Sequence, residues 1–135
     1  MQKRFLIFSG AAGALAVALG AMAAHALEKK VDGVMFTLRN LEVFETAARY
    51  QMYHALALLA LAFLSEKLDP KMINKAGYCF MAGIVLFSGS LYLISTAGLI
   101  GLSSIKWLGP ITPIGGLFFM AGWVLIIVSA LKKKA

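Results

Sequence analysis

The chain has 135 residues, of which 61% are hydrophobic and only 14% are charged. A water-soluble domain of this length could not bury that much apolar surface, so lipid is the expected solvent. The net charge of +7 would suggest nucleic acid as the partner of a soluble protein. In a membrane protein the same excess of lysine and arginine fixes orientation, so the expected partner is the lipid bilayer and no nucleic acid.

Four apolar segments are each close to the 20 or so residues that a helix needs to cross a bilayer. Because short links between them use up the length, residues 1–135 are predicted to form a single four-span transmembrane domain. The predicted fold is therefore all-α, a polytopic membrane protein built as a bundle of four transmembrane helices. The segments lie at about residues 5–25, 47–64, 76–97 and 112–131.

The first segment has an alternative as a secretory signal peptide. Lys3 and Arg4 precede the apolar run, and residues 21–23, Ala-Met-Ala, resemble a cleavage box. The run is long for a signal peptide, which favours a retained span. Small residues follow one stripe of this helix and predict close contact with a neighbouring helix, namely Gly13, Ala16, Gly20 and Ala23.

The polar segment after the first span predicts a short interfacial helix over residues 34–46, running into the second span. Asp32 could cap such a helix, with Gly33 easing the turn. Helical spacing places Leu41 and Phe44 on a packed face and the acidic side chains of Glu42 and Glu45 in water. The helix either contacts lipid or docks on the end of the bundle.

Small residues and prolines shape the third and fourth spans. Pro110 is expected to end any helical structure before it, and Pro113 suits the first turn of the next helix. Trp107 is placed where it can anchor the chain at the membrane interface. Seven-residue spacing of small side chains predicts tight helix contacts along both spans, at Gly83, Ser90 and Ala97 and at Gly115, Gly122 and Ser129.

The distribution of lysine and arginine predicts the topology. Eight of these residues flank the two termini and the second loop, and five lie on the opposite side, which favours both termini in the cytoplasm. The eight are Lys3, Arg4, Lys67, Lys71, Lys75, Lys132, Lys133 and Lys134; the five are Lys29, Lys30, Arg39, Arg49 and Lys106.

Polar side chains inside apolar spans are costly and often mark function, although they also hold membrane helices together. The predicted topology gathers such side chains in the outer half of the bundle, where they form either a structural network or a binding site. We expect His54 to face the interior and to bond Tyr92, Ser88 or a backbone carbonyl. The candidate polar cluster is His25, Tyr50, Gln51, His54, Ser88, Tyr92, Ser95 and Thr112.

The sequence offers little for catalysis or metal binding. His25 and His54 are the only histidines, and no carboxylate or cysteine in the spans is placed to complete a metal site with them. No Ser/His/Asp set, phosphate loop or dinucleotide fingerprint is present. We therefore expect no enzyme activity, no catalytic residue, no cofactor and no metal.

Five ordered motifs run along the chain: residues 20–27 (GAMAAHAL), 46–58 (TAARYQMYHALAL), 87–92 (FSGSLY), 111–116 (ITPIGG) and 122–123 (GW). Together they resemble the small membrane family catalogued as domain of unknown function 423. That family includes bacterial inner-membrane proteins of this size and the eukaryotic transmembrane protein 256. The resemblance implies a four-helix membrane protein with a polar segment after the first span, and it implies no activity.

Two functions remain open from the sequence. The first is a non-catalytic accessory or interaction subunit of the bacterial inner membrane, with a membrane-protein partner or a second copy of the chain. The second is a small-molecule binder or transporter, oligomeric because four spans are few. A continuous cavity reaching His54 would favour the second, and a filled, hydrogen-bonded core would favour the first.

Overall fold

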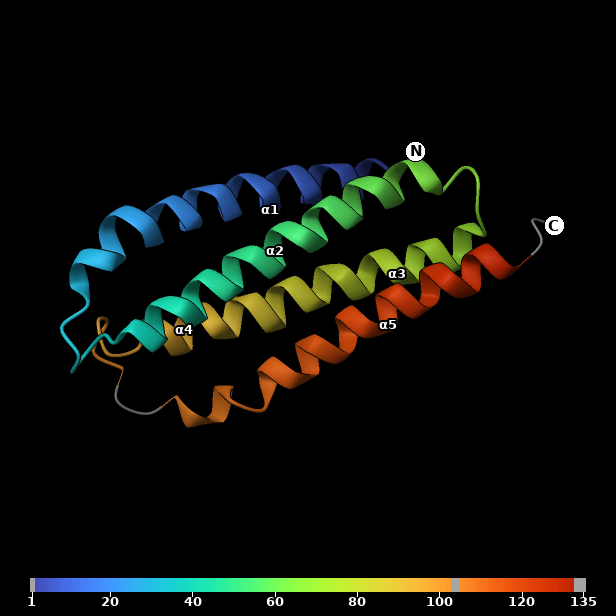
Figure 1. Ribbon diagram of the computed structural model, residues 1–135. Coiled ribbons are helices and arrows are strands. Elements are labelled where there is room, and N and C mark those ends of the chain that lie inside the picture. Colours follow the sequence, from blue (N-terminus) through green and yellow to red (C-terminus); the bar gives the residue numbers. More distant parts are fainter. Residues whose placement is uncertain (1, 103–104, 133–135) are drawn as a thin grey trace.

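The computed structural model describes residues 2–102 and 105–132, and these residues form helices and connecting loops without a strand. Successive long helices run antiparallel to each other in one elongated bundle (Figure 1). Helix α3 passes through the π-helical turn η3 into α4, so that these three elements form one continuous helix. The bounds are α1 Lys3–Met22, α2 Leu38–Leu64, α3 Pro70–Gly83, η3 Ile84–Ser88, α4 Gly89–Thr96 and α5 Ile111–Leu131.

Among the described residues, three helical segments are long and apolar enough to cross a membrane: Lys3–Lys30, Pro70–Thr96 and Lys106–Leu131. They correspond to the first, third and fourth predicted spans, the third of which was predicted to end one residue later, at Ala97. The second predicted span lies within α2, which has 27 residues but is not among the three. Arg49, Gln51 and His54 lower the hydropathy of its middle, and charged side chains fill its first turns.

The segment after α1 differs from the sequence prediction. A π-helical turn, η1 (Ala23–Leu27), and a 3₁₀ turn, η2 (Glu28–Lys30), extend α1. The helix predicted over residues 34–46 does run into the second span, but it begins only at Leu38, where α2 starts and continues unbroken to Leu64, so a distinct short interfacial helix is not confirmed. Within α2 the predicted packing is confirmed for Leu41 and Phe44, which are buried, and for Glu42, which is exposed; Glu45, predicted to lie in water, is half-buried.

A different residue from Asp32 caps α2. Thr37 accepts the Asn40 backbone N–H, and the Asn40 side chain accepts the Thr37 N–H, which is a capping box. The Asp32 carboxylate instead accepts the N–H groups of residues 34, 35 and 36 at 2.8 to 3.0 Å. These bonds, that of Phe36 first, hold the pKa of the Asp32 carboxyl below its ordinary value. Gly33 turns this loop with a φ of 76°.

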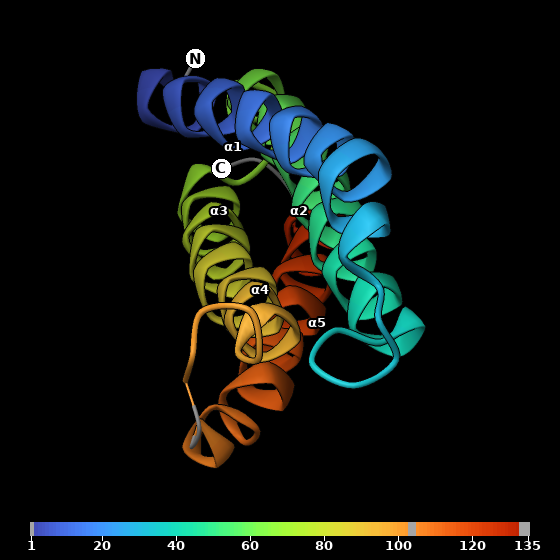
Figure 2. The same cartoon turned by 90° about the vertical axis from the view of Figure 1, so that its left-hand side faces the viewer.

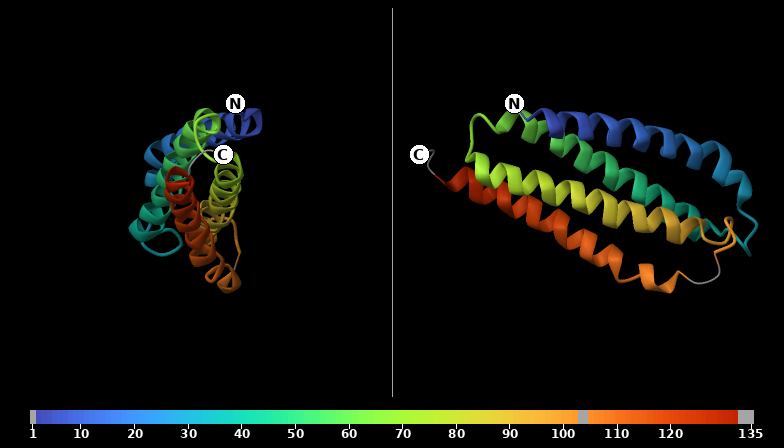
Figure 3. Two further views of the ribbon diagram at one scale, coloured as in Figure 1. Left: turned by 90° about the vertical axis from the view of Figure 1, so that its right-hand side faces the viewer. Right: turned by 180° about the vertical axis from the view of Figure 1, so that it is seen from behind.

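The helices pack as an open arrangement with α2 and α3 in the middle. Helix α1 packs along α2, α2 contacts α3, η3 and α4, and α5 packs along α3 and η3. Figure 2 and Figure 3 show α1 and α5 on opposite sides of the bundle. Helices α2 and α5 have little close backbone contact, so the bundle is not closed between them.

Glycines let aromatic rings fill the contact between helices. A Cβ at Gly115 would lie 2.8 Å from the Phe87 Cα, and side chains at Gly77 and Gly122 would enter the rings of Phe5 and Phe80. The predicted tight contacts of the third and fourth spans are confirmed at Gly83, Gly115 and Gly122, whereas Gly77 was not among the predicted residues. Only half of the predicted small-residue stripe on α1 lies in a helix contact. Ala16 and Ala23 are buried, whereas Gly13 and Gly20 have open space around them.

Candidate functional site

Gln51 is the centre of a buried polar network between three helices. It is 3% exposed, although it lies in the middle of α2. Its amide nitrogen donates to the Ala12 carbonyl of α1 at 2.8 Å, and its amide oxygen accepts the Tyr92 hydroxyl of α4 at 2.9 Å. The Gln51 side chain thus bonds α2 to both α1 and α4. An amide can do this because it donates through its nitrogen and accepts through its oxygen.

Serine hydroxyls extend this network along α2. Ser88 donates to the Ala47 carbonyl at 2.8 Å, and Ser9 of α1 donates to the Ala55 carbonyl at the same distance. Ser88 lies in η3, where the π-helical turn interrupts the α-helical register. We call this network the polar seam: Ser9, Gln51, Ser88 and Tyr92, with the carbonyls of Ala12, Ala47 and Ala55.

His54 lies on another face of α2 and is 4% exposed, so the prediction that it faces the interior is confirmed. Its Nδ1 bonds the Tyr50 carbonyl one turn earlier at 2.7 Å, and its Nε2 accepts from the Trp123 indole N–H at 3.2 Å. A carbonyl only accepts and an indole N–H only donates, so these bonds fix the tautomer with the proton on Nδ1. The ring stacks on Phe119 at 3.5 Å with an interplanar angle of 8°.

His54 forms part of the floor of a lateral groove between α2 and α5. The groove has a volume of about 830 Å³ and opens at the side of the bundle. Phe119 stacks on His54 and meets Phe87 at an interplanar angle of 58°. Tyr50 and Trp123, which are 41% and 49% exposed, also line the groove. We call this the aromatic groove: Tyr50, Tyr53, His54, Phe87, Pro113, Gly116, Leu117, Phe119, Met120 and Trp123.

The predicted polar cluster is therefore divided between several places. Ser95 donates to the backbone carbonyl of Tyr92 within its own helix, at 3.0 Å. Thr112 pairs with Ser90, 2.6 Å away, and so joins α5 to α4. His25 lies exposed in η1, apart from the other seven residues, because the turn directs it to the outside of the bundle. Gln51, Ser88 and Tyr92 belong to the seam; Tyr50 and His54 belong to the groove.

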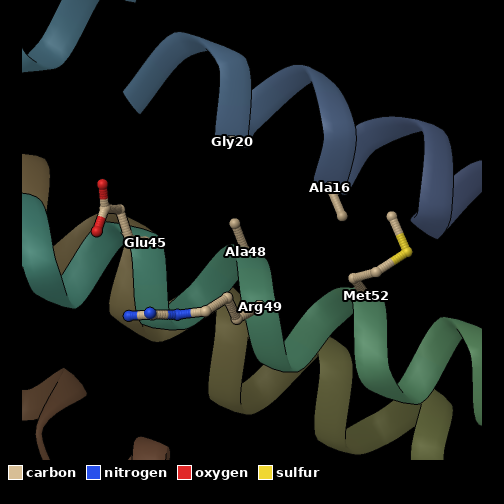
Figure 4. Close-up of a pocket in the computed structure, with 6 residues that line it drawn as sticks. All are labelled: Ala16, Gly20, Glu45, Ala48, Arg49 and Met52. Carbon is tan, nitrogen blue, oxygen red and sulfur yellow. The ribbon is translucent and has the colours of Figure 1, made fainter. Parts of the chain in front are cut away.

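A shallow pocket of about 290 Å³ lies between α1 and α2, toward the end that carries the loop of residues 31–37 (Figure 4). Ala16 and Gly20 form its α1 side, and Met52 reaches across from α2. Glu45 and Arg49 lie on neighbouring turns at its other end, but the structure records no ion pair between these two described residues. Arg49 instead reaches the Thr46 hydroxyl at 3.5 Å.

Comparison with known proteins assigns the family. The model described as Protein of unknown function (DUF423) matches residues 19–116. The chain belongs to the DUF423 family. The match covers all of α2 and the helix α3–η3–α4, and with them Gln51, His54, Ser88 and Tyr92; Phe119 and Trp123 lie beyond it.

Relatives of the family cover almost the whole chain. The UPF0382 membrane protein YwdK of Bacillus subtilis is 44% identical over 97% of this chain and 98% of its own. A UPF0382 membrane protein of Staphylococcus aureus is 41% identical over the same shares. The UPF0382 inner membrane protein YgdD of Escherichia coli is 36% identical over 99% of this chain and 95% of its own. The chain is thus an integral membrane protein. No solved structure matches it.

Sequence reasoning missed several residues of both regions. Ser9 is a single hydroxyl in a long apolar run and carries no periodic signal. Trp123 stands out in the sequence only as part of the GW motif, and its bond to His54 depends on the register of α5 against α2. Phe119 looks like any apolar residue of a span. Only helix packing reveals that it lies flat against His54.

Proposed function

We propose that this DUF423 chain crosses the inner membrane four times, with both termini in the cytoplasm, and acts as a non-catalytic interaction subunit. Helix α2 supports the fourth crossing, because it packs between α1 and α4 and must share their depth in the bilayer. The starts of α1 and α3 and the end of α5 lie at one end of the bundle (Figure 3). That end carries the larger share of lysine and arginine, which favours the cytoplasmic side.

The interaction role rests on one observation: the buried polar side chains form hydrogen bonds within the bundle. Across residues 2–102 and 105–132, no buried side-chain nitrogen or oxygen lacks a hydrogen-bond partner. Gln51 and Ser88 use their polar groups to bond neighbouring helices. Such bonds hold membrane helices together, because an unpaired polar group in hydrocarbon is costly.

The aromatic groove is the surface that we assign to the partner. It is a place where two helices leave the bundle open, and most of its lining is large aromatic rings. In a bilayer, a groove of this kind is filled either by lipid or by the side chains of another helix. Aromatic side chains with polar edges, such as Tyr50 and Trp123, are the residues most enriched where proteins meet.

Site-specific photo-crosslinking in native membranes tests this role. A photoreactive amino acid replaces Met120 in the groove or, as the matched control, Val124 on the same helix outside it. The proposal predicts a discrete protein adduct from position 120 and a much weaker one from position 124. Mass spectrometry of the adduct separates a second copy of the chain from a different membrane protein. Equal labelling at both positions would contradict the proposal.

Binding of a small apolar molecule is the second candidate, favoured by the extension of the groove to His54. A flat hydrophobic molecule would stack between Tyr50 and Trp123. Gly116→Leu should then fill the groove and abolish binding without lowering stability, because a Cβ at Gly116 meets only the Phe87 ring at 3.8 Å. Low-mass adducts from position 120, without a protein adduct, would decide for this candidate and against the first.

Topology has its own test. A reporter that is active only in the periplasm, fused after Leu131, should stay inactive, whereas the same reporter inserted at Gly33 should be active. The reverse pattern would contradict the proposed orientation. It would leave the crosslinking result unaffected, since the groove is defined by packing and not by orientation.

A further inference from the structure

The two ends of the bundle differ in charge. The end that holds the α1 start, the α2–α3 link and the α5 end carries eight basic and two acidic residues; the opposite end carries five basic and four acidic. One of the two acids, Asp69, already caps α3 and pairs with Lys132 at 3.9 Å. Lys133 and Lys134, which belong to the eight, lie outside the described residues. The first end is therefore strongly electropositive.

Within this end, α1 and α3 form a defined corner. The Phe5 ring rests on α3 where Gly77 has no side chain, which brings the first turn of α1 against α3. Arg4 then donates to the Tyr78 hydroxyl and, at 3.2 Å, to the Asn74 side-chain oxygen. Its guanidinium carbon lies 5.1 Å from the centre of the Tyr78 ring. Arg4 is thus held in place by neutral groups, with its charge not cancelled by them.

The corner presents hydrogen-bond donors and positive charge. A guanidinium has five N–H donors, of which Arg4 uses two here. Tyr78 accepts from Arg4 through its oxygen, so its own proton remains to donate. Lys71 and Lys75 lie on the same face of α3, one and two turns from Tyr78, and both are exposed. This combination of a fixed guanidinium, a hydroxyl and two ammonium groups is the chemistry that binds phosphate.

An apolar groove runs away from the corner along the same faces of the same two helices. Phe8, Leu15 and Leu19 follow Arg4 on one face of α1, and Val85 follows Tyr78 on one face of the opposite helix. The groove has a volume of about 360 Å³. From Phe8 to Leu19 it extends about 16 Å at 1.5 Å per residue, close to half of the roughly 30 Å hydrocarbon core. Its length is that of one membrane leaflet.

We propose that the corner and this groove together bind one anionic phospholipid. The phosphate lies at Arg4, Lys71 and Lys75, and one acyl chain lies between α1 and the helix α3–η3–α4. A basic site between membrane helices at the interface is a recognised way to hold an anionic headgroup. A free phosphate would use the corner alone, whereas a phospholipid also uses the groove. With the proposed topology, the lipid belongs to the cytoplasmic leaflet.

Native mass spectrometry of the full chain in mild detergent tests the site. Dioleoyl phosphatidylglycerol and dioleoyl phosphatidylcholine are added in turn, so that the acyl chains match and only the headgroup differs. Phosphatidylglycerol should bind about tenfold more tightly, and Lys71→Gln with Lys75→Gln should remove that preference. The matched control is Lys29→Gln with Lys30→Gln, which removes the same charge at the opposite end and should change nothing.

A second variant tests the groove without touching the charges. Gly89→Leu fits the open space at Gly89 and fills the groove, so it should weaken phosphatidylglycerol and phosphatidylcholine alike. Gly10→Leu, which also has open space around it but lies outside the groove, is its control. Equal binding of the two lipids by the unaltered chain would overturn the proposal. So would an equal loss in the Lys29/Lys30 control, or complete displacement of the lipid by inorganic phosphate. The assay needs neither the orientation nor the partner proposed above, so their failure and this one are separable.

Discussion

The polar seam and the aromatic groove both involve α2, but they differ in how α2 meets its neighbours. The polar seam joins α2 to α1 and to the helix α3–η3–α4 by hydrogen bonds. Helices α2 and α5 instead meet through aromatic side chains that line the open aromatic groove. Gln51 and His54 are three residues apart in the same helix. Gln51 hydrogen-bonds neighbouring helices, whereas His54 forms part of the floor of an open groove. A polar side chain in a membrane span therefore indicates a functional site only once its hydrogen-bond partners are known.

The largest expected effect comes from two adjacent glycines on α5. Gly115→Ala should destabilise the fold by about 1–3 kcal/mol, because its Cβ would meet the Phe87 backbone, which cannot rotate away. Gly116→Ala faces the groove and should be neutral or slightly stabilising, since alanine favours a helix. Reversible unfolding in mild detergent measures both. Equal losses at the two positions would mean that α5 is packed as closely at Gly116, in the groove, as at Gly115, against η3.

The seam itself should lose about 1–2 kcal/mol in Gln51→Leu, since both interhelical bonds go and the Tyr92 hydroxyl keeps no partner. Tyr92→Phe added to Gln51→Leu should restore part of this loss, because the hydroxyl left without a partner is then absent. The same unfolding assay measures this coupling in a double-mutant cycle. Tyr50→Phe removes a hydroxyl on the groove side and serves as the control, with little change expected. Additive effects of Gln51→Leu and Tyr92→Phe would argue against a direct bond.

A smaller effect is expected at the wall of the groove. Trp123→Phe keeps a ring but removes the N–H that bonds His54, so it should cost about 0.5–1 kcal/mol. Trp107, which is 66% exposed outside the groove, provides the control Trp107→Phe, with no measurable change. The shift of the unfolding midpoint tests this pair. A loss at Trp107 as large as that at Trp123 would show that the indole–imidazole bond contributes nothing specific.

The smallest effect concerns the loop after α1 and depends on pH. Because the pKa of Asp32 is lowered in the folded loop, its carboxylate stabilises the loop fully at pH values above the ordinary pKa of 3.8. This contribution disappears as the pH falls through the lower pKa of the folded state. Amide exchange of Val34, Met35 and Phe36 should therefore accelerate, relative to residues in α2, only in strong acid. Asp32→Asn should remove that pH dependence. An unchanged profile in Asp32→Asn would assign the effect to another group.

The sequence was sufficient for the helices and for much of the seam, for identifiable reasons. Long apolar runs predict membrane helices, and helical spacing places Tyr50, Gln51 and His54 on one side of α2. It could not give the division of that side into two regions, because the division depends on where α5 lies. It also placed His25 by depth alone, whereas the π-helical turn η1 sets its direction. The capping of α2 was misassigned because Asp32 and Thr37 are both good caps and only the bonds distinguish them.

The most direct test of the account compares Gln51→Leu with Gly116→Leu for both melting temperature and crosslinking from position 120. We predict that Gln51→Leu lowers the melting temperature while the fraction that remains folded still crosslinks. Gly116→Leu should leave the melting temperature nearly unchanged and abolish the adduct. If Gln51→Leu abolished crosslinking at an unchanged melting temperature, the seam would be the functional site, and the assignment of structure to the seam and contact to the groove would be wrong.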